Sequence, residues 1–238
     1  MEKIKKYSLI AAIIIVCAGV GFYLIWLLPN MENKNSSKNE ETIVELPQPK
    51  YDSQTSVEEA LLKRRSIRDY SDEPLALAEI SQLLWAAQGI TNERGFRTAP
   101  SAGALYPLEL YLVIGQVEGL AQGVYKYRPD GHQLEKISQE DKRADLARAA
   151  LGQSAVKEAA AMIVFAAVYQ RTTSKYGERG IRYVHIEVGH AAENVYLEAV
   201  SLNLGTVVIG AFDEKEIKRI IKMADEEEPV YLMPVGKK

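Results

Sequence analysis

The sequence predicts an α+β domain in which a sheet is flanked by helices. Segments with the 3.6-residue apolar spacing of helices occur along most of the chain. Apolar runs typical of strands lie among them, but helices and strands do not alternate strictly, as they would in a doubly wound parallel sheet. No Gly-x-Gly-x-x-Gly motif follows a predicted strand, so we do not expect a separate dinucleotide-binding domain.

The first part of the domain contains two predicted helices, a strand and a hairpin. Apolar residues fall at helical spacing in Val57–Arg65 and Leu77–Gly89, and turn and capping residues at Ser71–Pro74 separate these helices. Leu108–Ile114 is an apolar run typical of a strand. Val124–Ile137 predicts a hairpin because a Pro-Asp-Gly turn interrupts it.

The second part of the domain mixes the two element types in the same way. The run at Ala161–Tyr169 is apolar throughout, which suits a strand buried on both faces. The other predicted elements are a helix at Asp141–Leu151, a long helix at Tyr183–Leu204, a short strand at Thr206–Ile209, a helix at Asp213–Met223 and a last strand at Pro229–Val235.

The composition is that of an ordinary globular protein, with 47% hydrophobic and 26% charged residues among 238. The net charge of −3 argues against nucleic-acid binding through bulk positive charge. Cys17 is the single cysteine, which excludes an internal disulfide and a Cys-based zinc site. His185 and His190 are five residues apart, about 140° around a helix, so we predict no metal site.

The first 29 residues (1–29) predict an N-terminal membrane anchor. Ser8–Leu28 contains no charged residue and matches the roughly 20 residues that span a bilayer as a helix. Lysines precede this segment, and Tyr23 and Trp26 lie near its far end. The lysine bias predicts a single-pass membrane protein whose domain is extracytoplasmic. A cleaved signal peptide and a buried soluble helix are the alternative interpretations.

Residues 30–52 are polar, charged and interrupted by prolines, so we expect a flexible tether there. Residues 53–238 are enough for one well-packed domain, and they contain no internal repeat.

The segment Arg64-Arg65-Ser66-Ile67-Arg68 carries the first candidate site. If the preceding helix continues, Arg64 and Arg68 share one of its faces. Guanidinium groups and a hydroxyl suit a phosphate, because arginine offers forked donors to phosphate oxygens. The alternative is a basic helix end that complements the helix dipole.

Two further segments combine small residues with glycine. Ala99–Pro107 would let the backbone approach a flat ligand closely, and a simple loop before a strand is the alternative. In Leu204–Phe212, the backbone N–H groups around Gly210 and Ala211 could face a ligand. The alternative is a glycine C-cap followed by a short core strand.

Taken together, the three segments resemble the nitroreductase-like flavoenzymes, and within them the SagB/ThcOx-type dehydrogenase branch. The markers are RRSIRDYSDEPL at Arg64–Leu75, APSAGALYPLELYLV at Ala99–Val113, the stretch Tyr176–Glu214 and the closing strand at Pro229–Lys238. The resemblance implies a nitroreductase-like FMN-binding fold, whose central, mainly antiparallel sheet is flanked by helices. It also implies a homodimer that holds FMN at the subunit interface.

The resemblance places the residues that hold FMN in four parts of the chain. These are Arg64, Arg65, Ser66 and Arg68 at the phosphate and ribityl chain; Pro100, Ser101, Ala102, Gly103 and Ala104 along the isoalloxazine ring; Val208, Ile209, Gly210 and Ala211 beside the flavin; and Lys237 and Lys238 at the phosphate. Some nitroreductases have an acidic residue at the place of Gly210 and an Asn at that of Ala104, so those side-chain contacts are not expected here. Many relatives also have a longer C-terminal tail, which puts tail contacts to the partner subunit in doubt.

The flavin would carry the redox chemistry, by ping-pong hydride or electron transfer through N5, and no strict acid or base from the protein is implied. The substrate-side candidates are Tyr176, Arg182, Tyr183, His190 and Asn194, for each of which core or surface packing is the alternative.

The leading functional prediction is an FMN-dependent oxidoreductase, with peptide azoline oxidation as the activity that the branch suggests. An NAD(P)H-dependent nitro or quinone reductase is the activity that the wider family suggests. A membrane-tethered FMN protein that shuttles electrons or acts as a scaffold is a non-enzymatic alternative. A relative that has lost flavin and binds peptides is another.

Overall fold

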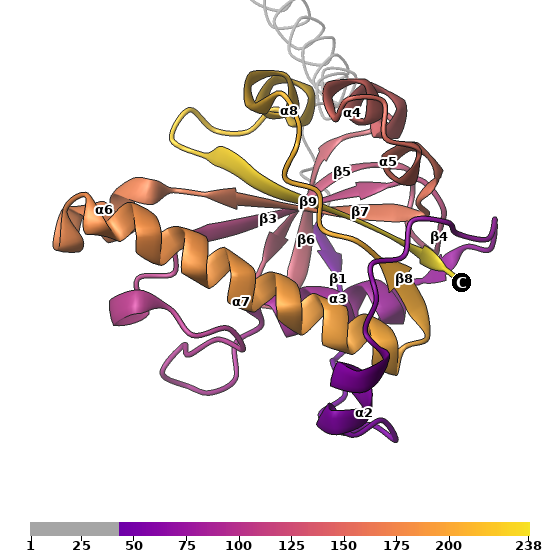
Figure 1. The fold of residues 1–238 in the computed structure, drawn as a ribbon, viewed down its shortest axis with the longest axis horizontal. Coiled ribbons are helices and arrows are strands. Elements are labelled where there is room, and N and C mark those ends of the chain that lie inside the picture. The colour runs from indigo at the N-terminus through magenta and orange to yellow at the C-terminus, as the bar shows by residue number, and fades with distance from the viewer. Residues whose placement is uncertain (1–42) are drawn as a thin grey trace, which may run out of the picture. The chain divides into compact units, whose positions relative to one another are not determined.

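A computed structural model describes residues 43–238 (Figure 1). The helices of this part are α2 (Val57–Lys63), α3 (Leu77–Gln88), the short 3-10 helix η2 (Ala102–Ala104), α4 (Arg143–Ala149), α5 (Ser154–Glu158), α6 (Tyr169–Tyr176), α7 (Arg179–Ser201) and α8 (Glu214–Ile221). The strands are β1 (Ile43–Glu45), β2 (Leu75–Ala76), β3 (Leu108–Ile114), β4 (Val117–Glu118), β5 (Gly123–Arg128), β6 (Gln133–Ser138), β7 (Ala161–Ala167), β8 (Leu204–Thr206) and β9 (Glu228–Lys237).

Seven strands form one central sheet in the order β1-β6-β5-β3-β7-β9-β8. Every pair of neighbours in this sheet is antiparallel. The two short strands β2 and β4 pair with each other in parallel, outside the central sheet. The α+β prediction with a mainly antiparallel sheet is therefore confirmed.

Helices cover both faces of the sheet (Figure 1). One apolar core lies between the sheet and the pair α3 and α7, and the other lies between the sheet and α4, α5 and α8. The central strand β7 contributes to both cores: Ile163 and Phe165 point to the first, and Met162 and Val164 to the second. This two-sided burial explains why its sequence is a continuous apolar run.

The helix α7 supports most of the candidate site. Its 23 residues extend for about 35 Å across one face of the sheet (Figure 1). Val184, Val188, Val195 and Ala199 lie on its buried side. Segments distant in the sequence therefore meet one another along this helix.

The expected tether ends earlier than the sequence suggested. Ile43–Glu45 forms the edge strand β1, which pairs with β6, and Leu46 is buried. The side-chain amide of Gln82 then holds Lys50, accepting from its N–H at 2.8 Å and donating to its C=O at 3.0 Å. The prediction of a flexible tether is wrong for residues 43–50, because their backbone polar groups find partners in the domain.

The other differences are small. The long helix begins at Arg179 rather than Tyr183, and the short strand before α8 is Leu204–Thr206 rather than Thr206–Ile209. The helix α6 was not predicted, because its sequence is mostly polar. The membrane segment Ser8–Leu28 and tether residues 30–42 lie outside the described residues and stay predictions. Among residues 43–238, no helix is both long and apolar enough to cross a membrane.

Candidate functional site

The arginine segment does not continue the helix before it. The helix α2 ends at Lys63, and Arg64 has an extended backbone with φ −54° and ψ 124°. The condition under which Arg64 and Arg68 would share a helix face is therefore not met, because the helix does not continue past Lys63. The segment instead passes beside β8, where the N–H of Ile67 donates to the C=O of Thr206 at 2.9 Å.

Tyr196, on α7, joins two of the predicted cofactor segments. Its hydroxyl lies 3.1 Å from Ser66 Oγ and accepts a hydrogen bond from the Val208 N–H at 2.8 Å. The Arg64 guanidinium lies 5.2 Å from the centre of its ring. This side chain is 8% exposed and brings Arg64, Ser66 and Val208 together. Tyr196 was not predicted as a site residue, because a tyrosine inside a long helix belongs to no recognisable motif.

The segment after β8 is held to the sheet at one residue. Ile209 is buried and exchanges two backbone hydrogen bonds with Leu232, at 2.8 and 2.9 Å. Gly210 and Ala211 follow it and are exposed. Their backbone is therefore accessible at the surface, on a segment whose position is fixed by the strand beside it.

The loop Pro100–Ala104 has a backbone that depends on glycine. Gly103 has φ +66°, and a Cβ there would lie 2.7 Å from the Tyr176 hydroxyl and 3.0 Å from Lys175 Nζ. Ser101 Oγ fixes the far side of the loop by accepting from the Tyr106 N–H at 2.9 Å. The missing side chain at Gly103 thus lets the end of α6 approach the loop.

The predicted cofactor residues fall into two groups along α7. The loop group meets the helix at the level of Glu187, where the Ser101 hydroxyl lowers the pKa of the carboxyl. The group of Ser66 and Val208 meets it at Tyr196. Nine residues of helix separate these levels, which is about 14 Å along the axis.

The C-terminal lysines are not joined to the arginine segment by any hydrogen bond or ion pair between described residues. Lys237 Nζ instead lies 2.5 Å from Glu79 Oε1, in an ion pair at the start of α3. Glu79 also accepts from the Ala76 N–H at 2.8 Å, which caps that helix. Lys238 is exposed at the end of the chain.

The substrate-side candidates divide in the same way. Tyr176 and Tyr183 stack edge to face, with ring centres 5.2 Å apart, beside the loop group. Asn194 instead donates to the C=O of Ala86 at 3.0 Å and so ties α7 to α3. His190 and Arg182 are exposed on α7.

Glu187, whose i, i+3 spacing to His190 suggested at most a structural pair, is a buried carboxyl on α7. Its side chain is 2% exposed, and its Oε1 has no hydrogen-bond partner within residues 43–238. Burial raises its pKa to about 7, against the opposing effects of the Ser101 hydroxyl and the Arg97 charge. A carboxyl that exchanges a proton near neutral pH therefore lies directly under the loop.

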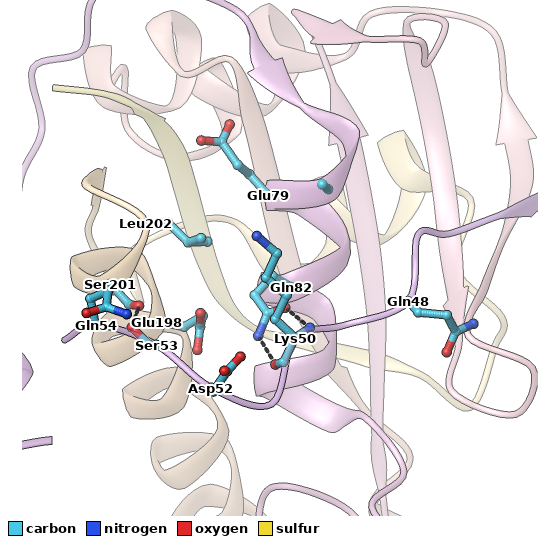
Figure 2. Close-up of a pocket in the computed structure, with 11 residues that line it drawn as sticks. Gln48, Lys50, Asp52, Ser53, Gln54, Glu79, Gln82, Glu198, Ser201 and Leu202 are labelled. Atoms are coloured by element: carbon cyan, nitrogen blue, oxygen red, sulfur yellow. Dashed lines mark hydrogen bonds between the residues drawn. The ribbon is translucent and has the colours of Figure 1, made fainter. Parts of the chain in front are cut away.

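The structure also contains a cavity of about 420 Å³ between the segment 48–54, α3 and the end of α7 (Figure 2). Figure 2 shows Gln82 holding Lys50 at its centre, with Glu79 and Glu198 on the walls. None of the residues predicted to hold FMN lines this cavity. The arginine segment and Gly210 lie outside it, so it is not the predicted cofactor site.

Metal ligands do not gather in the described part of the chain. Within residues 43–238, no group of three His, Cys, Asp or Glu side chains is placed to hold a metal ion. His185 Nε2 lies 2.8 Å from the Tyr169 hydroxyl, which accounts for one of the two histidines on α7.

Comparison with known proteins decides the family. The family model described as "Nitroreductase family" matches residues 61–237. The chain belongs to the nitroreductase family. The resemblance to the nitroreductase-like enzymes is therefore confirmed at the level of the family, which places the chain among oxidoreductases.

Several individual proteins are similar to this chain over most of the domain. A protein of Methanocaldococcus jannaschii designated a nitroreductase is 53% identical over 182 residues, covering 76% of this chain and 91% of that protein. The trifolitoxin operon protein TfxC of Rhizobium leguminosarum is 27% identical over 195 residues, and the match covers 75% of this chain but 54% of TfxC. A crystal structure of a Ralstonia eutropha protein designated a nitroreductase superposes with a TM-score of 0.73 at 29% identity, covering 84% of this chain and 91% of that one.

Proposed function

We propose that this nitroreductase-family chain is an FMN-dependent oxidoreductase. The observation that carries the proposal is the arginine segment. Arg64, Arg65 and Arg68 have no carboxylate within 4 Å among residues 43–238, although most other arginines there are paired. The segment therefore carries three arginines without an ion-pair partner among the described residues, together with the Ser66 hydroxyl. Guanidinium and hydroxyl donors are the groups that suit a phosphate dianion.

Two further features support binding of the rest of FMN: the contacts of Tyr196 and the exposed backbone at Gly210 and Ala211. Tyr196 holds Ser66 and Val208 in fixed positions, so the phosphate end and the segment beside the flavin are set by one phenol. Gly210 and Ala211 are exposed, so their backbone is accessible to a ligand at the surface. FMN, when bound, would supply the transfer of hydride or electrons.

A second copy of the chain is part of this proposal. The arginine segment, the loop Pro100–Ala104 and Gly210 lie mostly at the surface, and the two groups are about 14 Å apart along α7. Large apolar side chains are also exposed on neighbouring helices, with Leu62 on α2 at 73% and Ile186 on α7 at 49%. A homodimer would cover these side chains and enclose the cofactor between subunits.

We propose a peptide as the substrate, with oxidation of azolines to azoles as the reaction. The SagB/ThcOx-type motifs and the similarity to a protein of the trifolitoxin operon support this choice. The Tyr176 hydroxyl and Lys175 Nζ are the polar groups nearest to Gly103, which makes them the substrate-side pair at the loop. Nitro compounds and quinones, with NAD(P)H as donor, are the alternative substrates.

The test uses the full-length protein, purified in a mild detergent. Its visible spectrum and the mass of any released cofactor identify a flavin directly. Arg64→Ala and Arg68→Ala should each lower the FMN content, because each removes a charge-assisted contact worth about 1.5–3 kcal/mol. Arg219→Ala is the matched control, because Arg219 is paired with Glu216 on the distant helix α8.

A colourless wild-type protein that takes up no added FMN would refute the proposal. Full FMN content in both arginine variants would refute the phosphate assignment alone. If FMN is bound, turnover with an azoline peptide and with NAD(P)H plus a quinone separates the two substrate classes.

A further inference from the structure

A second cavity lies at the end of the sheet where β3 begins and β5 ends. Its volume is about 410 Å³, within the range of small-molecule sites. Leu108, Leu110 and Tyr127 contribute apolar wall, and three arginines, Arg97, Arg128 and Arg171, also line it. None of the residues assigned above to FMN lines this cavity.

Two of the three arginines are already neutralised. Arg128 forms an ion pair with Glu135, and Arg171 lies 2.5 Å from Glu109. Glu109 is also used by Lys126, whose ammonium lies 3.2 Å from its other oxygen. The acidic groups next to these two arginines are therefore engaged.

Arg97 differs from them. It donates from Nη1 to the neutral Gln88 Oε1 at 2.7 Å, and its guanidinium lies 4.6 Å from the centre of the Tyr106 ring. No carboxylate of residues 43–238 lies within 4 Å of it. Burial lowers its pKa, and the more distant charges of Glu109 and Glu187 only partly offset that effect. An arginine nevertheless keeps its proton in a protein, so Arg97 keeps a positive charge that no carboxylate of the described residues pairs with. Asp130 also lines the cavity, without an ion pair to any of the three arginines.

Gln88 adds a second unsatisfied donor at the same place. Its side chain is fully buried, and Nε2 has no hydrogen-bond partner within residues 43–238. Its Oε1 accepts from Arg97, so Nε2 is the atom left over. Gln88 thus lines the cavity with a buried amide nitrogen that lacks an acceptor, next to an arginine that lacks a counter-charge.

We propose that this cavity binds a carboxylate attached to a short apolar group, with Arg97 and Gln88 as its donors. A carboxylate supplies two acceptor oxygens and one negative charge. It would therefore give the Arg97 guanidinium a counter-charge and the unpaired Gln88 amide an acceptor. The apolar wall at Leu108, Leu110 and Tyr127 accommodates the attached group. The C-terminus of a peptide and a free short-chain acid share this chemistry.

The cavity is also linked to the loop Pro100–Ala104. Arg97 lies before this loop in the chain and Tyr106 lies after it, and the Arg97 guanidinium stacks on the Tyr106 ring. Tyr106 has φ +46°, a strained value for a non-glycine residue, and its C=O accepts from Arg171 at 3.0 Å. A carboxylate bound to Arg97 would therefore contact one member of the Arg97–Tyr106 pair that flanks this loop.

The binding test needs no flavin. N-acetyl-L-leucine, its neutral amide and hexanoate are titrated into the full-length protein by calorimetry, up to about 10 mM, since affinities near 1 mM are expected for such small probes. N-acetyl-L-leucine should bind at least about tenfold more tightly than its amide, because only the acid forms a charge-assisted contact. Hexanoate binding as tightly as N-acetyl-L-leucine identifies a free acid as the ligand, and much weaker hexanoate binding identifies a peptide C-terminus.

Three variants assign the binding to Arg97. Arg97→Gln should abolish the preference for the acid, whereas Arg128→Gln should leave it unchanged, because that guanidinium is already paired. Gln88→Glu places a carboxylate where Arg97 already donates, so it should block the probe while the melting temperature stays the same or rises. This last variant keeps the test valid if Arg97→Gln does not fold.

Equal binding of the acid and the amide would refute the proposal. Equal loss in Arg97→Gln and Arg128→Gln would also refute it, since that result indicates general surface charge. Neither outcome depends on FMN, so a failure here is separate from a failure of the proposed function.

Discussion

Replacing Tyr196 with phenylalanine removes a single oxygen from the centre of the candidate cofactor site. The ring and its contact with Arg64 stay, but the hydrogen bonds to Ser66 and to the Val208 N–H are lost. Each such bond contributes about 1 kcal/mol, so the free energy of unfolding should fall by about 1–3 kcal/mol. We expect FMN affinity to fall by about tenfold, because the two segments must then be ordered by the cofactor itself.

The assay is FMN titration, followed by quenching of flavin fluorescence, beside urea unfolding of the same samples. Tyr125→Phe is the matched control. It loses the hydrogen bond from Tyr125 to the C=O of Ala121, at 2.8 Å, on a strand away from the site. The control should lose stability without losing FMN affinity. If Tyr196→Phe binds FMN as tightly as Tyr125→Phe does, Tyr196 does not couple the two segments.

Three further predictions concern the loop and the N-terminus. The raised pKa of Glu187 means that the folded protein binds a proton more tightly than the unfolded chain, so the contribution of this proton to stability is full below pH 4.5 and is lost as the pH rises to about 7. Glu187→Gln should therefore be more stable than wild type at pH 8, by about 1–2 kcal/mol in urea unfolding. Equal stability of the two proteins at pH 8 would contradict this argument. Gly103→Ala should destabilise the protein by over 1 kcal/mol more than Gly95→Ala, because both glycines have positive φ but only Gly103 faces Tyr176; equal melting temperatures would contradict this. Deleting residues 1–29 should move the protein from the membrane to the soluble fraction, and an unchanged distribution would exclude an anchor there.

Most elements of the fold could be predicted because their signals are local. The predicted bounds of the strand Leu108–Ile114 match the structure at both ends, since a short apolar run between turn residues favours a buried strand over other structures. The edge strand β1 could not be predicted in this way. Its three residues form a strand only because β6 presents a free edge, and that depends on the whole sheet.

The candidate site was predictable as a set of segments but not as a geometry. Motifs identified the arginine segment and the loop Pro100–Ala104, yet nothing in them indicated that the helix stops at Lys63. The places of Tyr196 and Glu187 at the site could not be predicted for the same reason. Each is an ordinary residue of a long helix, and its importance comes from what two distant segments place beside it.

The pairing of β1 with β6 determines where the chain can be shortened. A fragment that began at residue 53 would lack β1 and leave the N–H and C=O groups of β6 without partners along one side. Such a bare edge accepts a strand from another molecule, which is a common route to aggregation. Truncations intended to yield a soluble domain should therefore begin before Ile43, even though the sequence up to Asp52 resembles a linker.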